Sequence, residues 1–208
     1  FETFNSFNVS ITQEENTTEF GGYIDYTINR GDLILQPSLR MQYYSSLAKF
    51  RPEPRIGLKY KASERLRLKA AAGMYSQNVI GANSDRDVVN LFYGFLSGPS
   101  NLQSDFVNPN GESTEVTHSL QTANHLVGGF EFDITEKMNL NVEGYVKHFT
   151  QLTNMNRNKI FDEADVSADV PEMFYMDYIV ESGLAKGVDV VLEYEENGTY
   201  LWLVYGYG

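Results

Sequence analysis

Three segments of alternating residues, 66–77, 128–134 and 138–147, most constrain how this chain can fold. In each segment an apolar or small residue is followed by a polar or small one, as with Leu68 and Lys69. A period of two is typical of a β-strand, because successive side chains point to opposite faces of the sheet. The segments therefore predict strands that have one apolar and one polar face.

The rest of the chain repeats this pattern and predicts eight strands. Short turns with Gly31, Thr135 or Gly198 alternate with longer connections, and the longest are predicted at 79–117 and 153–181. Pro52 and Pro54 are expected to delay the third strand after a connection of medium length, because proline cannot donate to a β-ladder. The predicted strands are 18–29, 33–44, 55–60, 66–77, 120–134, 138–152, 187–194 and 199–208.

Composition excludes several classes of protein. The formal net charge is -12, whereas nucleic-acid binding needs a basic surface, so no nucleic-acid partner is expected. The chain has no cysteine, which excludes disulfides and thiolate metal sites. No apolar run approaches the roughly 18 residues of a membrane helix. A membrane-spanning strand needs only about ten alternating residues, so the polar composition is compatible with a membrane barrel.

Strand alternation and loop order together predict an all-β fold, an antiparallel up-and-down transmembrane β-barrel. Such barrels have short periplasmic turns, long extracellular loops, an apolar outer face and a polar inner face. The charged row also indicates a wide, hydrated interior, because small barrels fill theirs with packed side chains. The alternative is a secreted β-sandwich with one solvated face. The charged residues predicted to face inward are Arg40, Arg55, Lys59, Arg67, Lys69, Glu131, Asp133, Glu143, Lys147, Asp189 and Glu193.

Several ordered segments resemble the barrel of TonB-dependent outer-membrane receptors. They are 54–60, 71–77, 141–147 followed by Leu152, and 182–189 followed by 202–205. The resemblance extends from about Thr18 onward, and the 84–99 segment is most similar to receptors of the Bacteroidetes type. It implies that residues 1–208 are a fragment of one barrel domain and supply about eight strands, from the C-terminal part, of a 22-stranded barrel. The plug domain, the TonB box and the remaining strands are expected outside this chain.

The resemblance also implies a function and a set of partners. The expected function is uptake of a scarce nutrient, such as a ferric siderophore, haem, cobalamin or a glycan, across the bacterial outer membrane. Expected partners are outer-membrane lipid and lipopolysaccharide, a TonB-type energy-coupling protein, and a surface lipoprotein or other complex partner. No cofactor and no enzymatic activity are expected. The alternative is a plugged barrel that docks a surface or secretion partner and transports nothing.

Candidate site residues follow from the same faces and loops. The three histidines are too scattered for a metal motif and are interpreted as surface or rim residues. Arg30, Gly31 and Asp32 are interpreted as a hairpin turn, and the acidic second loop as solvated. Candidate substrate-binding residues are Tyr75, Gln77, Arg86, Phe92, Tyr93 and Phe95. Residues predicted to face lipid are Leu35, Leu39, Met41, Ile56, Leu58, Leu68, Phe130, Phe132, Leu140, Val142, Val188, Val190 and Leu192.

Overall fold

The computed structural model describes residues 2–4, 10–12, 18–45, 47–78, 102–107, 111–161 and 169–208. In this part of the chain the regular structure is β-strand, apart from one short 3-10 helix. No helix among these residues has the length and hydropathy needed to span a membrane. The elements are β1 (Glu2–Phe4), β2 (Ser10–Thr12), β3 (Glu19–Asp25), β4 (Ile28–Arg30), β5 (Leu33–Tyr44), β6 (Lys49–Lys61), β7 (Leu66–Gln77), β8 (Asp105–Val107), β9 (Ser113–Glu115), β10 (Gln121–Thr135), β11 (Met138–Met155), η3 (Glu172–Phe174), β12 (Tyr178–Glu196) and β13 (Thr199–Tyr207).

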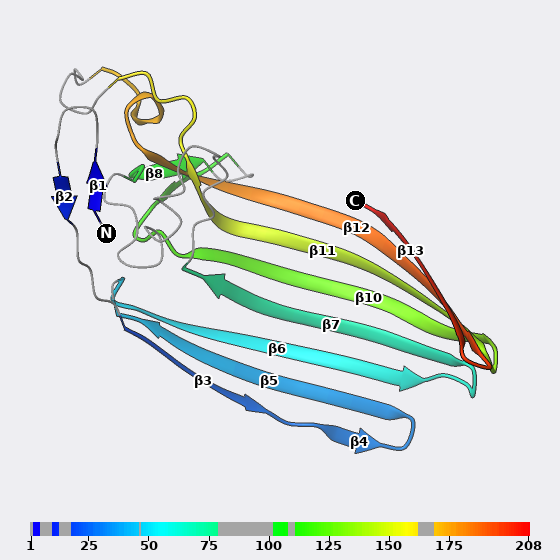
Figure 1. The fold of residues 1–208 in the computed structure, drawn as a ribbon. Coiled ribbons are helices and arrows are strands. Elements are labelled where there is room, and N and C mark those ends of the chain that lie inside the picture. Colours follow the sequence, from blue (N-terminus) through cyan, green and yellow to red (C-terminus); the bar gives the residue numbers. More distant parts are fainter. Residues whose placement is uncertain are drawn as a thin grey trace.

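The main feature is one large antiparallel sheet in which neighbours in sequence are neighbours in space. Its order is β13-β12-β11-β10-β7-β6-β5-β3, and β4 also pairs with β5. The turns after β4, β6, β10 and β12 meet at one rim, while the chain connects at the other rim through β8, β9 and η3 (Figure 1). The predicted up-and-down order of strands is therefore confirmed.

One connection is shorter than the sequence suggested. β6 begins at Lys49, directly after the turn that follows Tyr44, so the expectation that Pro52 and Pro54 delay this strand is wrong. Pairing with β5 continues past both prolines, whereas the ladder between β6 and β7 ends at the pair formed by Arg55 and Gly73. Proline lacks a donor for a ladder, and here both prolines lie on the stretch of β6 that has lost its β7 partner.

Pro37 explains why the predicted strand 18–29 is divided into β3 and β4. The backbone N–H of Tyr26 donates to the carbonyl oxygen of Pro37 at 3.1 Å. Pro37 has no N–H to return this bond, so regular pairing stops there. It resumes at Ile28, opposite Leu35, in the same register.

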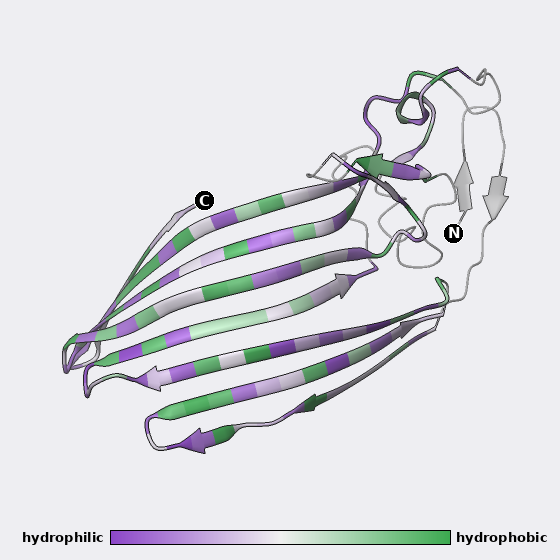
Figure 2. Ribbon diagram, turned by 180° about the vertical axis from the view of Figure 1, so that it is seen from behind, coloured by the Kyte–Doolittle hydropathy of each residue, from purple (hydrophilic) through white to green (hydrophobic). Residues whose placement is uncertain are grey.

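The sheet has one apolar and one polar face, and both remain open. Hydropathy alternates along the strands (Figure 2), and the register places all the residues predicted to face lipid on one side. We call this apolar side the outer face. It is not packed against a second sheet in the described residues, since Phe20, Ile24 and Leu126 are 64%, 65% and 59% exposed. A β-sandwich would bury that face, so the sandwich alternative is wrong. Contact of the face with lipid remains a prediction.

In the large sheet, strand length increases from β7 to β12. β5 and β7 have 12 residues each, whereas β11 has 18 and β12 has 19. At about 3.3 Å per residue, the longest strand measures about 60 Å, which exceeds the need of about ten residues for a tilted membrane strand. The extra length lies beside β8 and η3 (Figure 1).

The buried core lies at the loop end of the sheet and not along the wall. Leu120, Thr153 and Val180 are 1%, 2% and 4% exposed. A register shift after Phe149 marks the start of this region on β11. The strand extensions and the loops that they carry therefore form the tightly packed part of the molecule.

Candidate functional site

Ion pairs line the polar face near the rim of tight turns. Glu131 on β10 is central, because its carboxylate lies 2.9 Å from Lys59 Nζ, 2.9 Å from Arg67 Nε and 3.1 Å from Lys69 Nζ. Lys59 is on β6, two strands away from Glu131, so side chains on this face converge. We call the side of the sheet that holds these ion pairs the inner face. Their side chains keep 21% to 40% exposure, so the network is hydrated and not a sealed core.

The same network extends across β11. Arg67 makes a two-pronged contact with Asp133, with both N···O distances at 2.7 Å. Lys69 Nζ lies 2.5 Å from Glu143 and 3.0 Å from the side-chain oxygen of Asn141. Basic residues on β6 and β7 are therefore neutralised by acidic residues on β10 and β11. These three cations and three carboxylates form a balanced charge network that ties four strands together.

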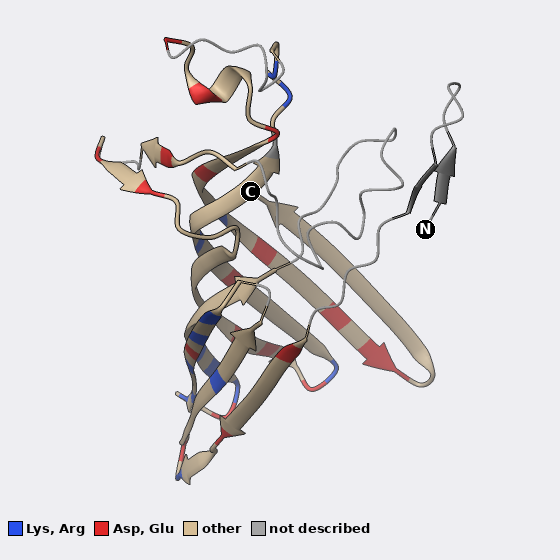
Figure 3. Ribbon diagram, turned by 90° about the vertical axis from the view of Figure 1, so that its left-hand side faces the viewer, with Lys and Arg blue, Asp and Glu red and all other residues tan. Residues whose placement is uncertain are grey.

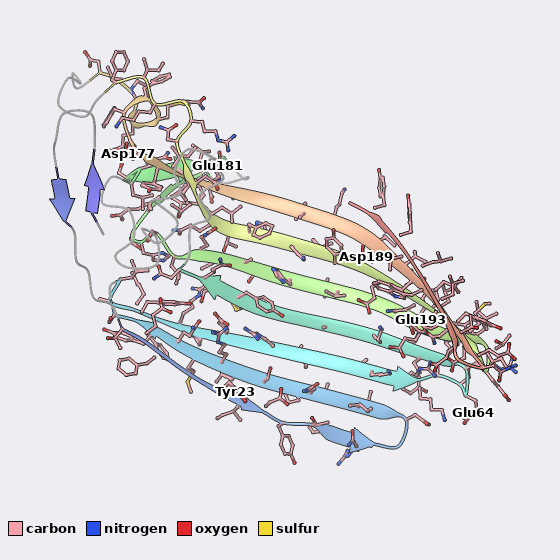
Figure 4. The ribbon with its side chains drawn as sticks, in the orientation of Figure 1. Tyr23, Glu64, Asp177, Glu181, Asp189 and Glu193 are labelled. Carbon is pink, nitrogen blue, oxygen red and sulfur yellow. The ribbon has the colours of Figure 1, made fainter. Side chains whose placement is uncertain are left out.

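Figures 3 and 4 show where further acidic residues lie. Acidic positions recur along β12, the last strand but one (Figure 3). Asp189 and Glu193 lie on β12, and Glu64 lies at the rim of tight turns (Figure 4). The register pairs Asp189 with Glu143 and Glu193 with Asn139, so both belong to the inner face. The part of this face near the tight turns therefore carries more carboxylates than cations.

Glu53 occupies the opening between β6 and β7. Its side chain is 0% exposed. One carboxylate oxygen accepts from the backbone N–H of Ser76 at 2.9 Å and contacts the Ser76 hydroxyl at 2.5 Å. The other oxygen accepts from Arg55 at 2.7 Å, and Arg40 lies 3.8 Å away. Both oxygens are occupied, so Glu53 holds the strands together and is not poised as a general base beside Ser76.

A row of basic residues crosses the inner face above the ion-pair network. The register aligns Arg55, Gly73, His125 and Lys147 on four successive strands. Tyr75 lies beside this row, where the Arg55 guanidinium sits 4.4 Å from its ring centroid. His125 stacks on Tyr75 with ring centroids 4.3 Å apart. Cation–π and stacking contacts of this kind fix the orientation of the rings.

Phe149 and Tyr145 extend this cluster on β11. His125 meets Phe149 edge-on, with centroids 6.4 Å apart. The Lys147 ammonium lies 4.9 Å from the ring centroid of Tyr145. We call Arg55, Tyr75, His125, Tyr145, Lys147 and Phe149 the basic–aromatic row. It can present positive charge and hydrogen-bond donors to a solute on the inner face.

The two long connections are joined to each other at the loop end. The backbone N–H of Ser104 donates to Glu172 at 2.8 Å, and that of Gln103 donates to the carbonyl oxygen of Tyr178 at 3.2 Å. Asn156 donates to the carbonyl oxygens of Met173 and Met176 at 2.7 and 2.8 Å. The described parts of both loops therefore form one hydrogen-bonded unit at the end of β11 and β12, which we call the loop unit.

His118 lies at the base of this unit, outside the strands of the wall. Gln151 Nε2 donates to its carbonyl oxygen at 2.5 Å. Burial lowers the pKa of His118 below its ordinary value, and the positive charges of Lys49 and Arg51 lower it further. Neutral His118 is therefore favoured in the folded protein.

The predicted site residues are only partly placed by the structure. Tyr75 lies on the inner face within the basic–aromatic row, and Gln77 is exposed at the end of β7. Arg86, Phe92, Tyr93 and Phe95 lie outside the described residues. A ligand contact by any of these residues remains a prediction.

Sequence reasoning missed two contributors. Glu53 was assigned to a connection because Pro52 and Pro54 flank it. Its position in the alternation, on the polar face of the strand, could have identified it as a residue of that face. His125 was interpreted as a surface or rim histidine, although it has the parity of Glu131 on the same strand. It lies within the predicted strand 120–134, so the parity of that strand would have placed it on the inner face.

No protein-family model and no curated protein sequence matches this chain. A crystal structure of a mutant ferric enterobactin receptor, PfeA of Pseudomonas aeruginosa, matches 90% of the chain with a TM-score of 0.57 and 13% identity. The siderophore receptor PirA of the same organism also matches 90%, with a TM-score of 0.54 and 11% identity. This chain has the fold of part of a β-barrel wall. It spans 26% of the PfeA chain and 34% of the PirA chain.

Proposed function

We propose that this chain is part of the wall and outer loops of a TonB-dependent outer-membrane receptor that takes up a scarce nutrient. The observation that carries the proposal is the two-faced up-and-down sheet, with tight turns at one rim and joined loops at the other. The outer face is apolar and the inner face holds hydrated ion pairs, as a plugged barrel in a membrane requires. The structural likeness to two siderophore receptors supports the same class.

In this proposal the wall binds and guides, and it carries out no chemical step. The loop unit would make the first contact with a solute, and the basic–aromatic row would meet it inside the barrel. The balanced network around Glu131 would present hydrogen-bonding groups to a plug domain, which would move when an energy-coupling protein acts on it. Siderophores, haem, cobalamin and glycans remain the candidate nutrients, and a receptor of the Bacteroidetes type remains the candidate source.

The test uses the full-length parent protein in its host. A strain that lacks the parent gene, and a strain that lacks the TonB-type protein, would be grown with iron, haem, cobalamin or a glycan as the limiting nutrient. We expect both strains to lose growth on the same nutrient, and the parent gene in trans to restore it. Undiminished growth of the first strain on all four nutrients would contradict the proposal.

A second candidate function is docking of a protein partner without transport. It is favoured by three apolar side chains on the loop unit, since Ile160, Phe161 and Met173 are 69%, 44% and 46% exposed. The backbone N–H groups of Ile160 and Phe161 both donate to the carbonyl oxygen of Phe174, which brings the three side chains into one region. Exposed apolar groups of this kind occur at protein contacts.

Crosslinking in intact cells separates the two functions. If docking is the function, a photo-crosslinker at Ile160 should capture the same partner with or without the TonB-type protein. Deletion of the parent gene should then leave uptake of every nutrient unchanged. A TonB-dependent uptake defect would instead favour the receptor.

A further inference from the structure

We infer that the basic–aromatic row is a binding site for the negatively charged part of a solute, with Lys147 as the group that contacts the charge. This inference depends on the proposed function only in assuming that solutes reach the inner face. It distinguishes anionic nutrients from neutral ones, which the proposed function leaves open.

The first support is the distribution of charge. On β10, β11 and β12 the Lys and Arg residues are Lys147 and Lys186, whereas acidic residues recur along these strands. Lys186 belongs to the outer face, because it pairs with Val146. Lys147 is therefore the one cation on the inner face of these three strands, in a chain whose formal net charge is -12.

The second support is that Lys147 has no acidic partner. Among the described residues, no carboxylate lies within ion-pair distance of its ammonium, in contrast to Lys59 and Lys69. The positive charge of Lys147 therefore remains available to a solute.

The third support is a set of donors that surround Lys147. Within the described part of the chain, the hydroxyls of Tyr75 and Tyr145 and the imidazole of His125 have no hydrogen-bond partner. Carboxylates and phosphates accept stronger hydrogen bonds from a positively charged donor than from a neutral one. A neutral solute would not gain the charge-assisted bond.

Glycines hold these rings close to the sheet. A Cβ atom at Gly187 would lie 2.6 Å from the hydroxyl oxygen of Tyr145. A Cβ atom at Gly73 would lie 2.9 Å from Arg55 Cγ and 3.1 Å from Tyr75 Cε2. Because both glycines lack a side chain, the rings can lie against the backbone. The row is therefore preorganised and remains accessible from the inner face.

The test compares two probes that differ in charge and little in shape. Binding of benzoate and of benzamide to the purified full-length protein in detergent would be measured by saturation-transfer NMR. We expect benzoate to bind in preference to benzamide. A rise in salt concentration from 50 mM to 500 mM should weaken the binding of benzoate. A charge-assisted hydrogen bond contributes about 1.5–3 kcal/mol, so Lys147→Gln should reduce benzoate affinity by about tenfold or more.

The matched control is Lys186→Gln, on the neighbouring strand but on the outer face, which should leave benzoate affinity unchanged. Lys147→Arg should retain most of it, and retention of gel mobility before heating would confirm that each variant is folded. Equal binding of both probes, an unaffected Lys147→Gln variant, or equal losses in both Gln variants would overturn the inference. The inference would also fail if benzoate did not bind because an acidic segment of the parent protein covered the row.

The growth test and the binding test fail independently. Benzoate preference without TonB-dependent growth would leave the site in place and remove the proposed function. TonB-dependent growth on a nutrient, with no benzoate preference in the purified protein, would support the proposed function and contradict the binding site.

Discussion

The carboxylate of Glu53 accepts a hydrogen bond from the backbone N–H of Ser76 at 2.9 Å, where the ladder between β6 and β7 has ended. A side chain thus supplies the acceptor that a neighbouring strand would otherwise provide. Both edges of the opening remain connected, although Pro52 and Pro54 lie on the β6 edge.

Glu53→Ala should be among the most destabilising substitutions in the wall. It removes a buried acceptor from Ser76 and leaves Arg55 without its carboxylate, and breaking a buried ion pair costs about 3–5 kcal/mol. Denaturant unfolding of the full-length protein in lipid vesicles would measure the loss. Glu53→Gln keeps the shape and part of the bonding, so it should cost less.

The control for that substitution is Glu64→Ala, because Glu64 forms an exposed pair with Lys61 and its side chain is 90% exposed. Exposed pairs of this kind add little to stability, so no measurable change is expected. Similar losses for Glu53→Ala and Glu64→Ala would contradict the role assigned to Glu53.

Adjacent residues on β5 test the two faces of the sheet. Leu39 shares the outer face with Ile24 and Pro54, whereas Arg40 lies on the inner face beside Glu53. Leu39→Arg should cost about 2–4 kcal/mol if that face meets hydrocarbon near the middle of the membrane. Arg40→Leu should cost less, because Arg55 still pairs with Glu53. Unfolding in vesicles would compare them, and equal losses would count against the assignment of faces.

Gly128 and Gly129 form a second adjacent pair with opposite expectations. A Cβ atom at Gly129 would lie 2.2 Å from the carbonyl oxygen of Val142 and 2.9 Å from Glu143 Cα. A Cβ atom at Gly128 has its nearest neighbour at 4.0 Å. Gly129→Ala should therefore destabilise the barrel by about 1–3 kcal/mol through overpacking, while Gly128→Ala should be nearly neutral. Thermal unfolding followed by gel mobility would separate them, and the reverse order would show that the register is wrong.

Protonation of His118 should loosen the loop unit. Its pKa in the folded protein is lowered, whereas an unfolded histidine has a pKa of about 6.5. The unfolded form therefore binds protons more readily as the pH falls through about 6.5, and stability decreases toward lower pH. After correction for the intrinsic exchange rate at each pH, the amides of residues 111–120 should be less protected from hydrogen exchange at pH 5.5 than at pH 7.5 in the full-length protein. His118→Gln should reduce this difference, and an unchanged difference would exclude His118 as its cause.

Much of the fold could be predicted from the sequence because barrel strands alternate strictly. The parity of Leu68 and Lys69, continued along each strand, placed both rows on the faces that the register shows. Tight turns were also predictable, since Gly31 and Gly198 both adopt positive φ. In each case the signal was local, within a few residues of the feature that it specified.

The errors occurred where the deciding contact was distant in sequence. Pro52 and Pro54 do not interrupt β6, because β6 still pairs with β5 there and Glu53 contacts Ser76 across the opening to β7. The basic–aromatic row was not recognised because Arg55, His125 and Lys147 are aligned only when the strand register is known. Residue spacing along one strand cannot reveal which residue lies beside it on the next strand.

The unequal lengths of the strands make the loop-bearing rim of this wall higher on one side. The 18 and 19 residues of β11 and β12 continue as a paired ribbon beyond the shorter strands, and the loop unit is hydrogen-bonded to its end. If the chain is part of the proposed receptor, a large solute or protein that reaches this rim would contact the extended end of β11 and β12 before the ends of β5 and β6.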